Sequence, residues 1–487
     1  MTKVIRIGIA SEQAGPELVD AFCAAMANVA GTFGDREARA LELGNELARR
    51  WIERDLQAQA DTFADEVVID GRQYARQQRG ACRYHTLAGP VVVHRETFRI
   101  VGMHNGPTVV PLEVGAGLCE RATPALAFSI TQGFAERPLR HYEVEMRAAY
   151  RHSPSRSTLE RIGKRVGAAL ETMVSGAEPT IRNAEPVLSE VASLSVGLDR
   201  TSVPMAEVTG PVALHPPRIR RPPPPVTVAY RMAYVATVSA HDHDGNVLLT
   251  QRFAATPTEG TDRLLSRIGA ELRHLQDRYA GVPTAVVQDG APELWNLIAH
   301  LRDRHGVVID HERIDRFHVD ERLAAVCELV TRDAWTATQL RESWRACLDR
   351  SDTAVDRIIR RLDELVAHLW FGVIEGTPMP AFWSKRVPSS ISHATLTLIG
   401  GHIEYLRKQR HRIRYAGARR RGHPIGSGPT EGACKSVVAM RFKRSGQRWF
   451  ETGLAPCLFL RSLHLSARLR PCFEILQASQ IASLRAA

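Results

Sequence analysis

The chain has 487 residues, of which 44% are hydrophobic, and a chain of this size and composition forms two or three domains with buried cores. Its formal net charge of +11 at pH 7 points to a polyanionic partner such as nucleic acid. No apolar run approaches the roughly 18 residues that cross a bilayer, and the N-terminus lacks the apolar region of a signal peptide. We therefore expect a cytoplasmic protein with no membrane partner. The 8 cysteines include no Cys-x-x-Cys pair, so neither a disulfide framework nor a zinc ribbon is indicated.

Residues 1–210 are predicted to form an N-terminal region of helices and a small sheet that recognises DNA. Helical spacing runs from Pro16 to Phe63, and β-rich runs follow between Arg76 and Leu112. Helical signals return between Glu136 and Met173, interrupted at Pro154. The two helices beside this proline are consistent with a DNA-binding helix-turn-helix, and equally with solvated amphipathic helices that pack on their neighbours.

The segment 211–225, PVALHPPRIRRPPPP, is predicted to be a linker and the main domain boundary, because its prolines exclude a helix or a central strand. Beyond it, a β-hairpin with Asp244-Gly245 at its turn precedes alternating helices and strands. This order predicts a mixed sheet flanked by helices, as in an RNase H-like core. We therefore expect a multidomain chain of the α+β and α/β class. Beyond the linker, residues 226–319 form the first part of the core, and residues 320–418 form a long helical insertion. Residues 419–487 form the last part of the core, with a basic C-terminal segment.

Three acidic residues are candidates for a catalytic metal site: Asp242, Asp289 and Glu431. They follow predicted strands or open a predicted helix, and the ends of neighbouring strands meet at one edge of a sheet. Phosphodiester chemistry with two divalent ions requires carboxylates that together hold metals roughly 3.5–4 Å apart. Asp244 is an alternative first ligand, although an Asp before Gly more often serves the turn. For Asp289 the competing role is a helix N-cap.

Other polar residues near these carboxylates have weaker signals. Glu293 is a reserve ligand, but a Glu in the first turn of a helix usually only complements its dipole. Asp315 and His318 are possible accessory residues that form a hydrogen-bonded pair, either positioning DNA or tuning a ligand. A pair of this kind is more often structural.

A Gly-rich turn and a dense set of cations surround Glu431. Gly426, Ser427 and Gly428 precede a helix whose first turn carries this Glu. Their spacing does not match a P-loop, which disfavours an NTPase. Trp449 is a candidate for stacking on an unpaired base, although core packing is its more common role. Together with Trp449, the predicted DNA-binding residues are these cations: Arg419, Arg420, Arg421, Lys435, Arg441, Lys443, Arg444 and Arg448.

The second half of the chain resembles the ISKra-type transposases of bacterial insertion sequences, which belong to the DDE group. The motifs are YRMAYVATVSAHDHDG, VVQDGAPELWN, IDRFHVDERL and PIGSGPTEGACKSVVAMRFKRSGQRW, in that order between Tyr230 and Trp449. The resemblance implies an RNase H-like catalytic domain with an α-helical insertion, and Asp242, Asp289 and Glu431 as a DDE triad that binds Mg²⁺ or Mn²⁺. It also likens Asp315 and His318 to a D-x-x-H feature of related transposases.

The sequence therefore predicts a DNA transposase that binds the ends of its insertion sequence, cleaves phosphodiesters and transfers strands by two-metal chemistry. Its expected partners are double-stranded DNA, both element ends and target, and further copies of the chain assembled on the nucleoid DNA. Two alternatives remain: a catalytically inactive DNA-binding regulator derived from a transposase, and a metal-dependent nuclease without strand transfer.

Overall fold

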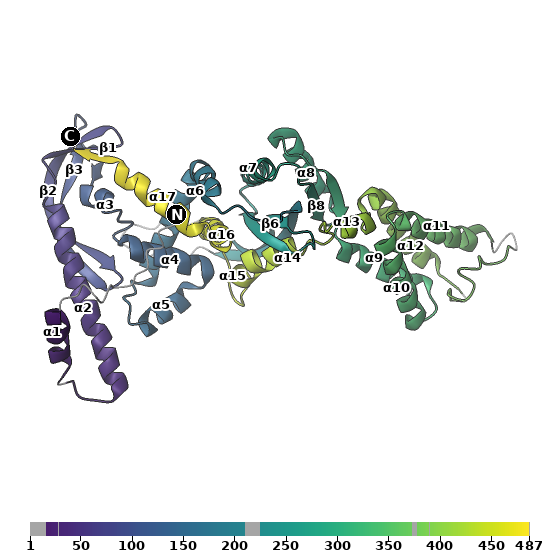
Figure 1. Ribbon diagram of the computed structural model, residues 1–487, viewed down its shortest axis with the longest axis horizontal. Helices are drawn as coiled ribbons and strands as arrows, with labels where there is room; N and C mark the ends of the chain where they lie inside the picture. The colour runs from purple at the N-terminus through teal and green to yellow at the C-terminus, as the bar shows by residue number, and fades with distance from the viewer. Residues whose placement is uncertain (1–15, 28, 210–224, 373–376, 389, 487) are drawn as a thin grey trace. The chain divides into compact units, whose positions relative to one another are not determined.

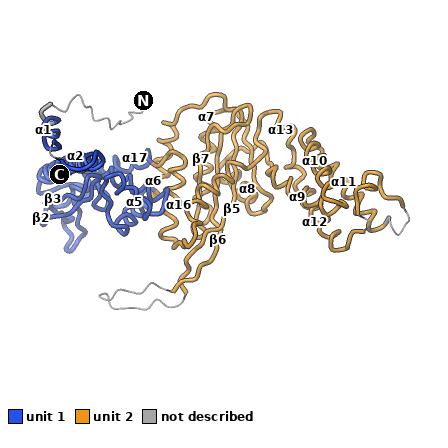
Figure 2. Tube along the Cα trace, turned by 90° about the horizontal axis from the view of Figure 1, so that it is seen from below, with its two compact units in different colours: residues 1–170, 470–487 blue, residues 171–469 orange. Residues whose placement is uncertain are grey.

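A computed structural model of the chain describes residues 16–27, 29–209, 225–372, 377–388 and 390–486. The chain divides into two compact units, one of residues 1–170 with 470–487 and the other of residues 171–469 (Figure 2). Within the described ranges, no helix has both the length and the apolar character that a bilayer span requires.

The first unit is built on a five-stranded sheet with the order β10-β1-β2-β3-β4 (Figure 1). A capping box starts the long helix α2 (Phe33–Ala60), because Asp35 N donates to Thr32 Oγ1 while Thr32 N donates to Asp35 Oδ2. Alternate residues of the long β2–β3 hairpin, among them Tyr84 and Val93, face a hydrophobic core. The strands are β1 (Glu66–Ile69), β2 (Arg72–Thr86), β3 (Gly89–Ile100), β4 (Thr108–Val109) and β10 (Leu484–Ala486).

The helices of this unit agree with the expected helical start and the return of helices after the sheet. α5 and α6 lie on either side of Pro154, where a helix-turn-helix was one of two predictions. Arg161 of α6 pairs with Glu120 at 3.1 Å, so this cation has a carboxylate partner. The helices are α1 (Pro16–Met26), α2 (Phe33–Ala60), α3 (Pro111–Gly115), α4 (Pro124–Glu136), α5 (Leu139–Ala148), α6 (Arg156–Ala184), which continues into the second unit, and α17 (Leu469–Ala482).

The second unit contains a five-stranded sheet with the order β7-β6-β5-β8-β9. The pairs β5–β6 and β6–β7 are antiparallel, whereas β5–β8 and β8–β9 are parallel. Thus β5 is the central strand, and β6 runs opposite to β5, β8 and β9. The strands are β5 (Ser193–Val208), β6 (Val226–His241), β7 (Val247–Ala255), β8 (Thr284–Gln288) and β9 (His311–Ile314), and the helices among them are α7 (Asp262–Arg278) and α8 (Pro292–His305).

The predicted domain boundary at 211–225 requires correction. Strands β5 and β6 pair along their whole lengths, from Ser193 opposite His241 to Val208 opposite Val226. The Pro-rich segment, of which 210–224 lies outside the described residues, therefore connects two paired strands and does not separate two domains. The central strand of the second sheet belongs to the region that was predicted to end at 210, and the boundary between the units falls within α6.

A helical tract follows β9, as expected, and shares one hydrophobic cluster with the sheet. Trp383 is fully buried in it and donates from Nε1 to Arg361 O at 2.8 Å. Helix α16 then packs on β7. The elements are α9 (Arg316–Val330), α10 (Ala334–Arg350), α11 (Ala354–Ala367), η1 (His368–Gly372), α12 (His393–Gln409), η2 (Arg410–Arg412), α13 (Ala416–Arg420), α14 (Gly428–Ala433), η3 (Cys434–Ala439), α15 (Met440–Phe442) and α16 (Glu451–Leu465).

Candidate functional site

Three aspartates form a row at the C-terminal edge of the parallel strands. Gln288 of β8 pairs with Ile314 of β9, and the next residues on these strands are Asp289 and Asp315. On the other side of β8, Val196 of β5 pairs with Val286, and Asp199 and Asp289 each lie three residues beyond that pair. Because neighbouring strands are about 4.8 Å apart, residues at matching positions lie close together. We call this row of Asp199, Asp289 and Asp315 the carboxylate edge.

Asp242 lies at the opposite edge of the sheet, so the prediction that it shares an edge with Asp289 is wrong. The residue before it, His241, pairs with Ser193, which is six residues before Asp199 on β5. Since a strand rises about 3.3 Å per residue, Asp242 and Asp199 are separated by about 20 Å. The physical reason is strand direction: β6 is antiparallel to β5, and its C-terminal end meets the start of β5.

The carboxylate of Asp242 serves the β6–β7 turn. Asp242 Oδ1 accepts hydrogen bonds from Asp244 N at 2.9 Å and Asn246 N at 2.8 Å, and Oδ2 accepts one from Asn246 Nδ2 at 2.9 Å. The hydrogen bonds from Asn246, its side chain first, lower the pKa of Asp242. The alternative ligand Asp244 lies in the same turn, before Gly245 with φ 83°. Both residues therefore behave as turn residues.

Glu431 belongs to helix α14, which packs on β5 and β6 at the centre of the sheet. Thr430 Oγ1 lies 2.7 Å from Thr237 Oγ1 of β6. A Cβ at Gly197 of β5 would collide with the Thr430 side chain and would lie 2.8 Å from the backbone oxygen of Val287, so only glycine permits this approach. Glu431 Oε1 accepts a hydrogen bond from Ser427 Oγ at 3.1 Å.

A thiol connects β5 with the segment that follows α14. Cys434 Sγ, at the start of η3, donates to Asp199 Oδ2 at 3.3 Å. Burial raises the pKa of Cys434, and the charges of Asp199 and Glu431 add to this rise. The carboxylates of a β5 residue and an α14 residue are therefore both close to one buried thiol. The predicted residues Asp289 and Glu431 thus lie near the same edge, together with Asp199.

Asp315 has a structural role that orders the Gly-rich turn. This residue is 1% exposed and caps α9, where its Oδ1 accepts from Phe317 N at 2.6 Å and His318 N at 3.3 Å. Its Oδ2 accepts a hydrogen bond from Ser427 N, which anchors the turn that precedes Glu431. Asp315 therefore holds the start of α14 against the end of β9.

The expected hydrogen-bonded side-chain pair of Asp315 and His318 is not formed. The ring Nδ1 of His318 instead lies 3.0 Å from Glu321 Oε2. Burial alone would lower the pKa of His318, but the hydrogen bond with Glu321 and the charges of Asp315 and Asp289 raise it above its ordinary value. His318 therefore lies within the electrostatic field of the carboxylate edge.

The donor set at this edge suits a hard divalent cation, because Asp199, Asp289 and Glu431 offer carboxylate oxygens, the ligands that Mg²⁺ and Mn²⁺ prefer. In the parts of the chain that the structure describes, no three His, Cys, Asp or Glu side chains are already grouped as metal ligands. Asp199 is turned toward Cys434 and Glu431 toward Ser427. Residues of the right chemistry thus share one edge, with side chains directed at neighbouring donors.

Comparison with known proteins assigns the chain to no family. No protein-family model matches the sequence, and no curated protein matches it. Among solved structures, one similar chain belongs to a Drosophila P element transposase strand transfer complex, with 14% sequence identity and a TM-score of 0.34 over 71% of this chain and 92% of that chain. Similarity at this level assigns neither a fold nor an activity.

Two of the predicted DNA-binding residues pack against each other: Arg441 is buried, and Trp449 is partly buried. Arg441 is 2% exposed, and its guanidinium lies 4.8 Å from the ring centre of Trp449. Burial lowers the pKa of Arg441. Trp449 also packs on Phe442 at 4.9 Å, and its backbone N donates to Pro204 O at 3.0 Å. The prediction that Arg441 contacts DNA is therefore wrong because it is buried, and for Trp449 the core alternative holds.

The remaining cations do not form one flank. Gly422, next to Arg421, contacts the turn that contains Asp242, since a Cβ at Gly245 would lie 3.3 Å from Gly422 O. Arg419 pairs with Asp349 at 3.0 Å. It lies three residues before Gly422, and Arg420 and Arg421 lie between them. Arg421 is thus close to the edge of the sheet opposite the carboxylates, whereas Asp349, the partner of Arg419, also pairs with Arg316, the residue after Asp315.

Lys443 lies on the other side, at the carboxylate edge. Its Nζ donates to Thr201 Oγ1 at 2.6 Å, two residues after Asp199. The predicted DNA-binding cations that follow Glu431 and are exposed are Lys435, Lys443, Arg444 and Arg448.

Sequence reasoning missed Asp199. Its run, SLSVGLDRTSV, alternates apolar and small residues, and its first buried stretch ends at Leu198, which is a readable strand signal. The next residue, Arg200, forms an ion pair with Glu293 at the start of α8, so the reserve ligand Glu293 is engaged by a cation. The strand that carries Asp199 could therefore have been predicted, but the Pro-rich segment after it favoured a domain boundary.

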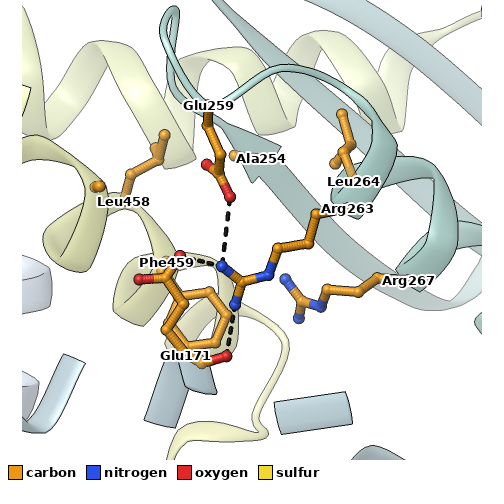
Figure 3. Close-up of a pocket in the computed structure, with 9 residues that line it drawn as sticks. Glu171, Ala254, Glu259, Arg263, Leu264, Arg267, Leu458 and Phe459 are labelled. Atoms are coloured by element: carbon orange, nitrogen blue, oxygen red, sulfur yellow. Dashed lines mark hydrogen bonds and ion pairs between the residues drawn. The ribbon is translucent and has the colours of Figure 1, made fainter. Parts of the chain in front are cut away.

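A small pocket elsewhere in the second unit is a structural ion-pair cluster (Figure 3). Arg263 of α7 forms ion pairs with Glu171 and, at 3.5 Å, with Glu259. Arg267 binds Glu178 at 2.7 Å. These side chains come from α6, α7 and the loop before it, and every charge has a partner, so the pocket is not a candidate for catalysis.

Proposed function

We propose that the chain is a metal-dependent DNA-processing enzyme in which Asp199, Asp289 and Glu431 are the catalytic carboxylates. One observation supports this assignment above all: Asp199 and Asp289 occupy matching positions on adjacent parallel strands, and Cys434 joins the helix of Glu431 to Asp199. Asp199 takes the place for which Asp242 was predicted.

The proposed fold of the second unit is RNase H-like. Its support is the sheet, in which three antiparallel strands (β5, β6, β7) precede two parallel strands (β8, β9), with β5 at the centre and α7 and α8 as connections. In this proposal α9 to α12 form the helical insertion that separates the β9 strand from the Glu431 segment.

The proposed roles follow from the chemistry of the residues. Bound Mg²⁺ or Mn²⁺ would activate the attacking hydroxyl and stabilise the leaving oxygen of a phosphodiester. Asp199, Asp289 and Glu431 would supply oxygen ligands, and Ser427 would orient Glu431 through its hydroxyl. Lys443, exposed beside Thr201, would take a backbone phosphate next to the site.

The finer proposal is a transposase of an insertion sequence, with double-stranded DNA as substrate and several copies of the chain on the two element ends. Its support is the set of sequence motifs between Tyr230 and Trp449, of which VVQDGAPELWN and PIGSGPTEGACK carry two of the proposed ligands. A nuclease with the same carboxylates would cut DNA but would not join ends.

The test is an assay of purified protein with duplex DNA that carries the ends of the element, in Mg²⁺ or Mn²⁺. We expect cleavage at the ends and joining of the freed 3′-OH to a second DNA. Cleavage without joined products would leave the nuclease alternative. Binding without any cleavage would support the inactive regulator and contradict the proposed enzyme.

A further inference from the structure

Helix α12 brings a tyrosine to the carboxylate edge. Tyr405 lies against Gly290, the residue after Asp289, because a Cβ at this glycine would be 2.7 Å from both the Tyr405 hydroxyl oxygen and a ring carbon. No larger residue at 290 would allow this approach without moving the ring. The tyrosine comes from the helical tract, 115 positions further along the chain than Gly290 (405 less 290).

An arginine accompanies this tyrosine. The guanidinium of Arg322, on α9, lies 4.8 Å from the centre of the Tyr405 ring, a cation–π contact. Arg322 is exposed, and within the described residues no carboxylate forms an ion pair with it. One turn before Tyr405, burial and the charge of Arg322 lower the pKa of His402, so His402 is a neutral neighbour of this cation.

The environment of Tyr405 suits a hydrogen-bond donor. Burial raises the pKa of Tyr405, and the charges of Asp289 and Asp315 raise it further, against the effect of Arg322. The hydroxyl therefore stays protonated at neutral pH. In the described part of the chain this hydroxyl donates no hydrogen bond, and the guanidinium of Arg322 lies beside its ring. A protonated hydroxyl and an unpaired guanidinium next to a row of carboxylates match a phosphate group that approaches the edge from the side of the helical tract.

We propose that Tyr405 and Arg322 are positioning residues that hold a DNA phosphate neighbouring the one that is cleaved. The Tyr405 hydroxyl donates to a non-bridging oxygen of that phosphate, and Arg322 neutralises its charge. This inference rests on the proposed function, because it requires DNA at the carboxylate edge. It assigns to the helical tract a direct part in aligning the substrate with Asp289.

Tyr405→Phe is the first test, since phenylalanine retains the ring that packs on Gly290 and Arg322. We expect an unchanged melting temperature and a change in DNA affinity of about threefold or less, because many contacts share the binding. Single-turnover cleavage should fall about tenfold to a hundredfold, because one charge-assisted hydrogen bond and the alignment it provides are lost. A purely packing role would leave cleavage unchanged in this variant.

Arg322 is tested by the salt dependence of binding to a double-stranded oligonucleotide. Arg322→Ala should reduce the slope of log affinity against log salt by about 1, because one phosphate contact is removed, and Arg322→Lys should restore that slope. The matched control is Arg407→Ala on α12, the helix of Tyr405, whose guanidinium is engaged by Asp363 at 2.9 Å and Glu404 at 3.1 Å. The control should keep the slope of the parent chain.

The outcomes separate this inference from the proposed function. If the parent chain cleaves DNA, and Tyr405→Phe cleaves at the same rate while Arg322→Ala keeps the full slope, the positioning role is refuted and the enzyme assignment stands. If the parent chain binds DNA without cleaving it, the enzyme assignment fails and the slope of Arg322→Ala decides the phosphate contact. If the parent chain does not bind DNA, both fail.

Discussion

Replacing Arg468 with alanine should destabilise the second unit by about 3–5 kcal/mol, the usual cost of removing one partner from a buried ion pair. Arg468 is 2% exposed and holds two carboxylates at once. Its Nε and Nη2 donate to Glu185 at 2.7 and 2.8 Å, and its Nη1 and Nη2 donate to Glu271 at 2.7 and 2.8 Å. Glu271 is fully buried, and without Arg468 its closest remaining cation is Arg182 at 3.4 Å.

The penalty should depend on pH. Burial alone would raise the pKa of Glu271, but the hydrogen bond and charge of Arg468, with the charge of Arg182, bring it below its ordinary 4.5. An acid whose pKa is lowered by folding stabilises the protein above its unfolded pKa and loses that contribution as the pH falls through the folded value. The difference between the parent chain and Arg468→Ala should therefore be largest near pH 7 and shrink below the unfolded pKa of about 4.5.

Denaturant unfolding followed by tryptophan fluorescence measures this difference, because the tryptophans at positions 295, 335, 344, 370, 383 and 449 report on the second unit and only Trp51 on the first. Lys408→Ala is the control, since Lys408 is 71% exposed and its ion pair with Glu404 is 3.6 Å long; we expect a change within about 0.5 kcal/mol. A loss below about 1 kcal/mol for Arg468→Ala, or a loss equal at pH 7 and pH 4, would refute the reasoning.

Two other predictions concern the surroundings of Glu431. Gly197→Ala should cost about 1–3 kcal/mol by driving a methyl group into Thr430 and should slow cleavage as well, and denaturant unfolding beside a cleavage assay would show both effects. Lys443→Ala with Arg444→Ala should flatten the salt dependence of DNA binding by about 2, whereas Arg441→Ala should lower stability and leave that slope unchanged, because Arg441 is buried; a flatter slope for Arg441→Ala would contradict this distinction.

Much of the architecture of the second unit could be predicted from local sequence signals. The hairpin turn at Asp244-Gly245 and the helix opened by Pro292 rest on residues whose backbone preferences act within a few positions. The same holds for the placement of Asp289 at a strand end and of Glu431 in the first turn of a helix. These features needed no knowledge of the tertiary fold.

The identity of the first carboxylate could not be predicted in this way, because it depends on strand direction. Asp199 follows the first buried stretch of β5 and Asp242 follows the end of β6, and sequence patterns do not show whether a strand is parallel or antiparallel to its neighbour. The hairpin of β5 with β6 is closed by the Pro-rich segment, which has the composition of a linker. Without β5 in the sheet, Asp242 was the only aspartate at a strand end before Asp289.

The burial of Arg441 also could not be predicted from the sequence. Arg441 stands among exposed cations in the chain, yet its side chain faces Trp449 and Cys457 of α16. Arg421 is close to Glu431 in sequence, but the chain crosses the sheet from one edge to the other between Gly422 and Ser427, as the contacts of Gly422 with the Asp242 turn and of Ser427 with Asp315 show. Neighbours in sequence therefore became residues of opposite edges.

The most direct test of the proposed site compares Asp199→Asn with Asp242→Asn. Both changes remove one carboxylate charge at nearly constant side-chain volume; Asp199 lies within β5, and Asp242 follows the last residue of β6. We measure DNA cleavage in Mg²⁺ and the rise in melting temperature that Mn²⁺ induces. The account predicts that Asp199→Asn loses both, while Asp242→Asn retains both. Cleavage at the parent rate by Asp199→Asn, with loss of cleavage in a folded Asp242→Asn, would contradict it.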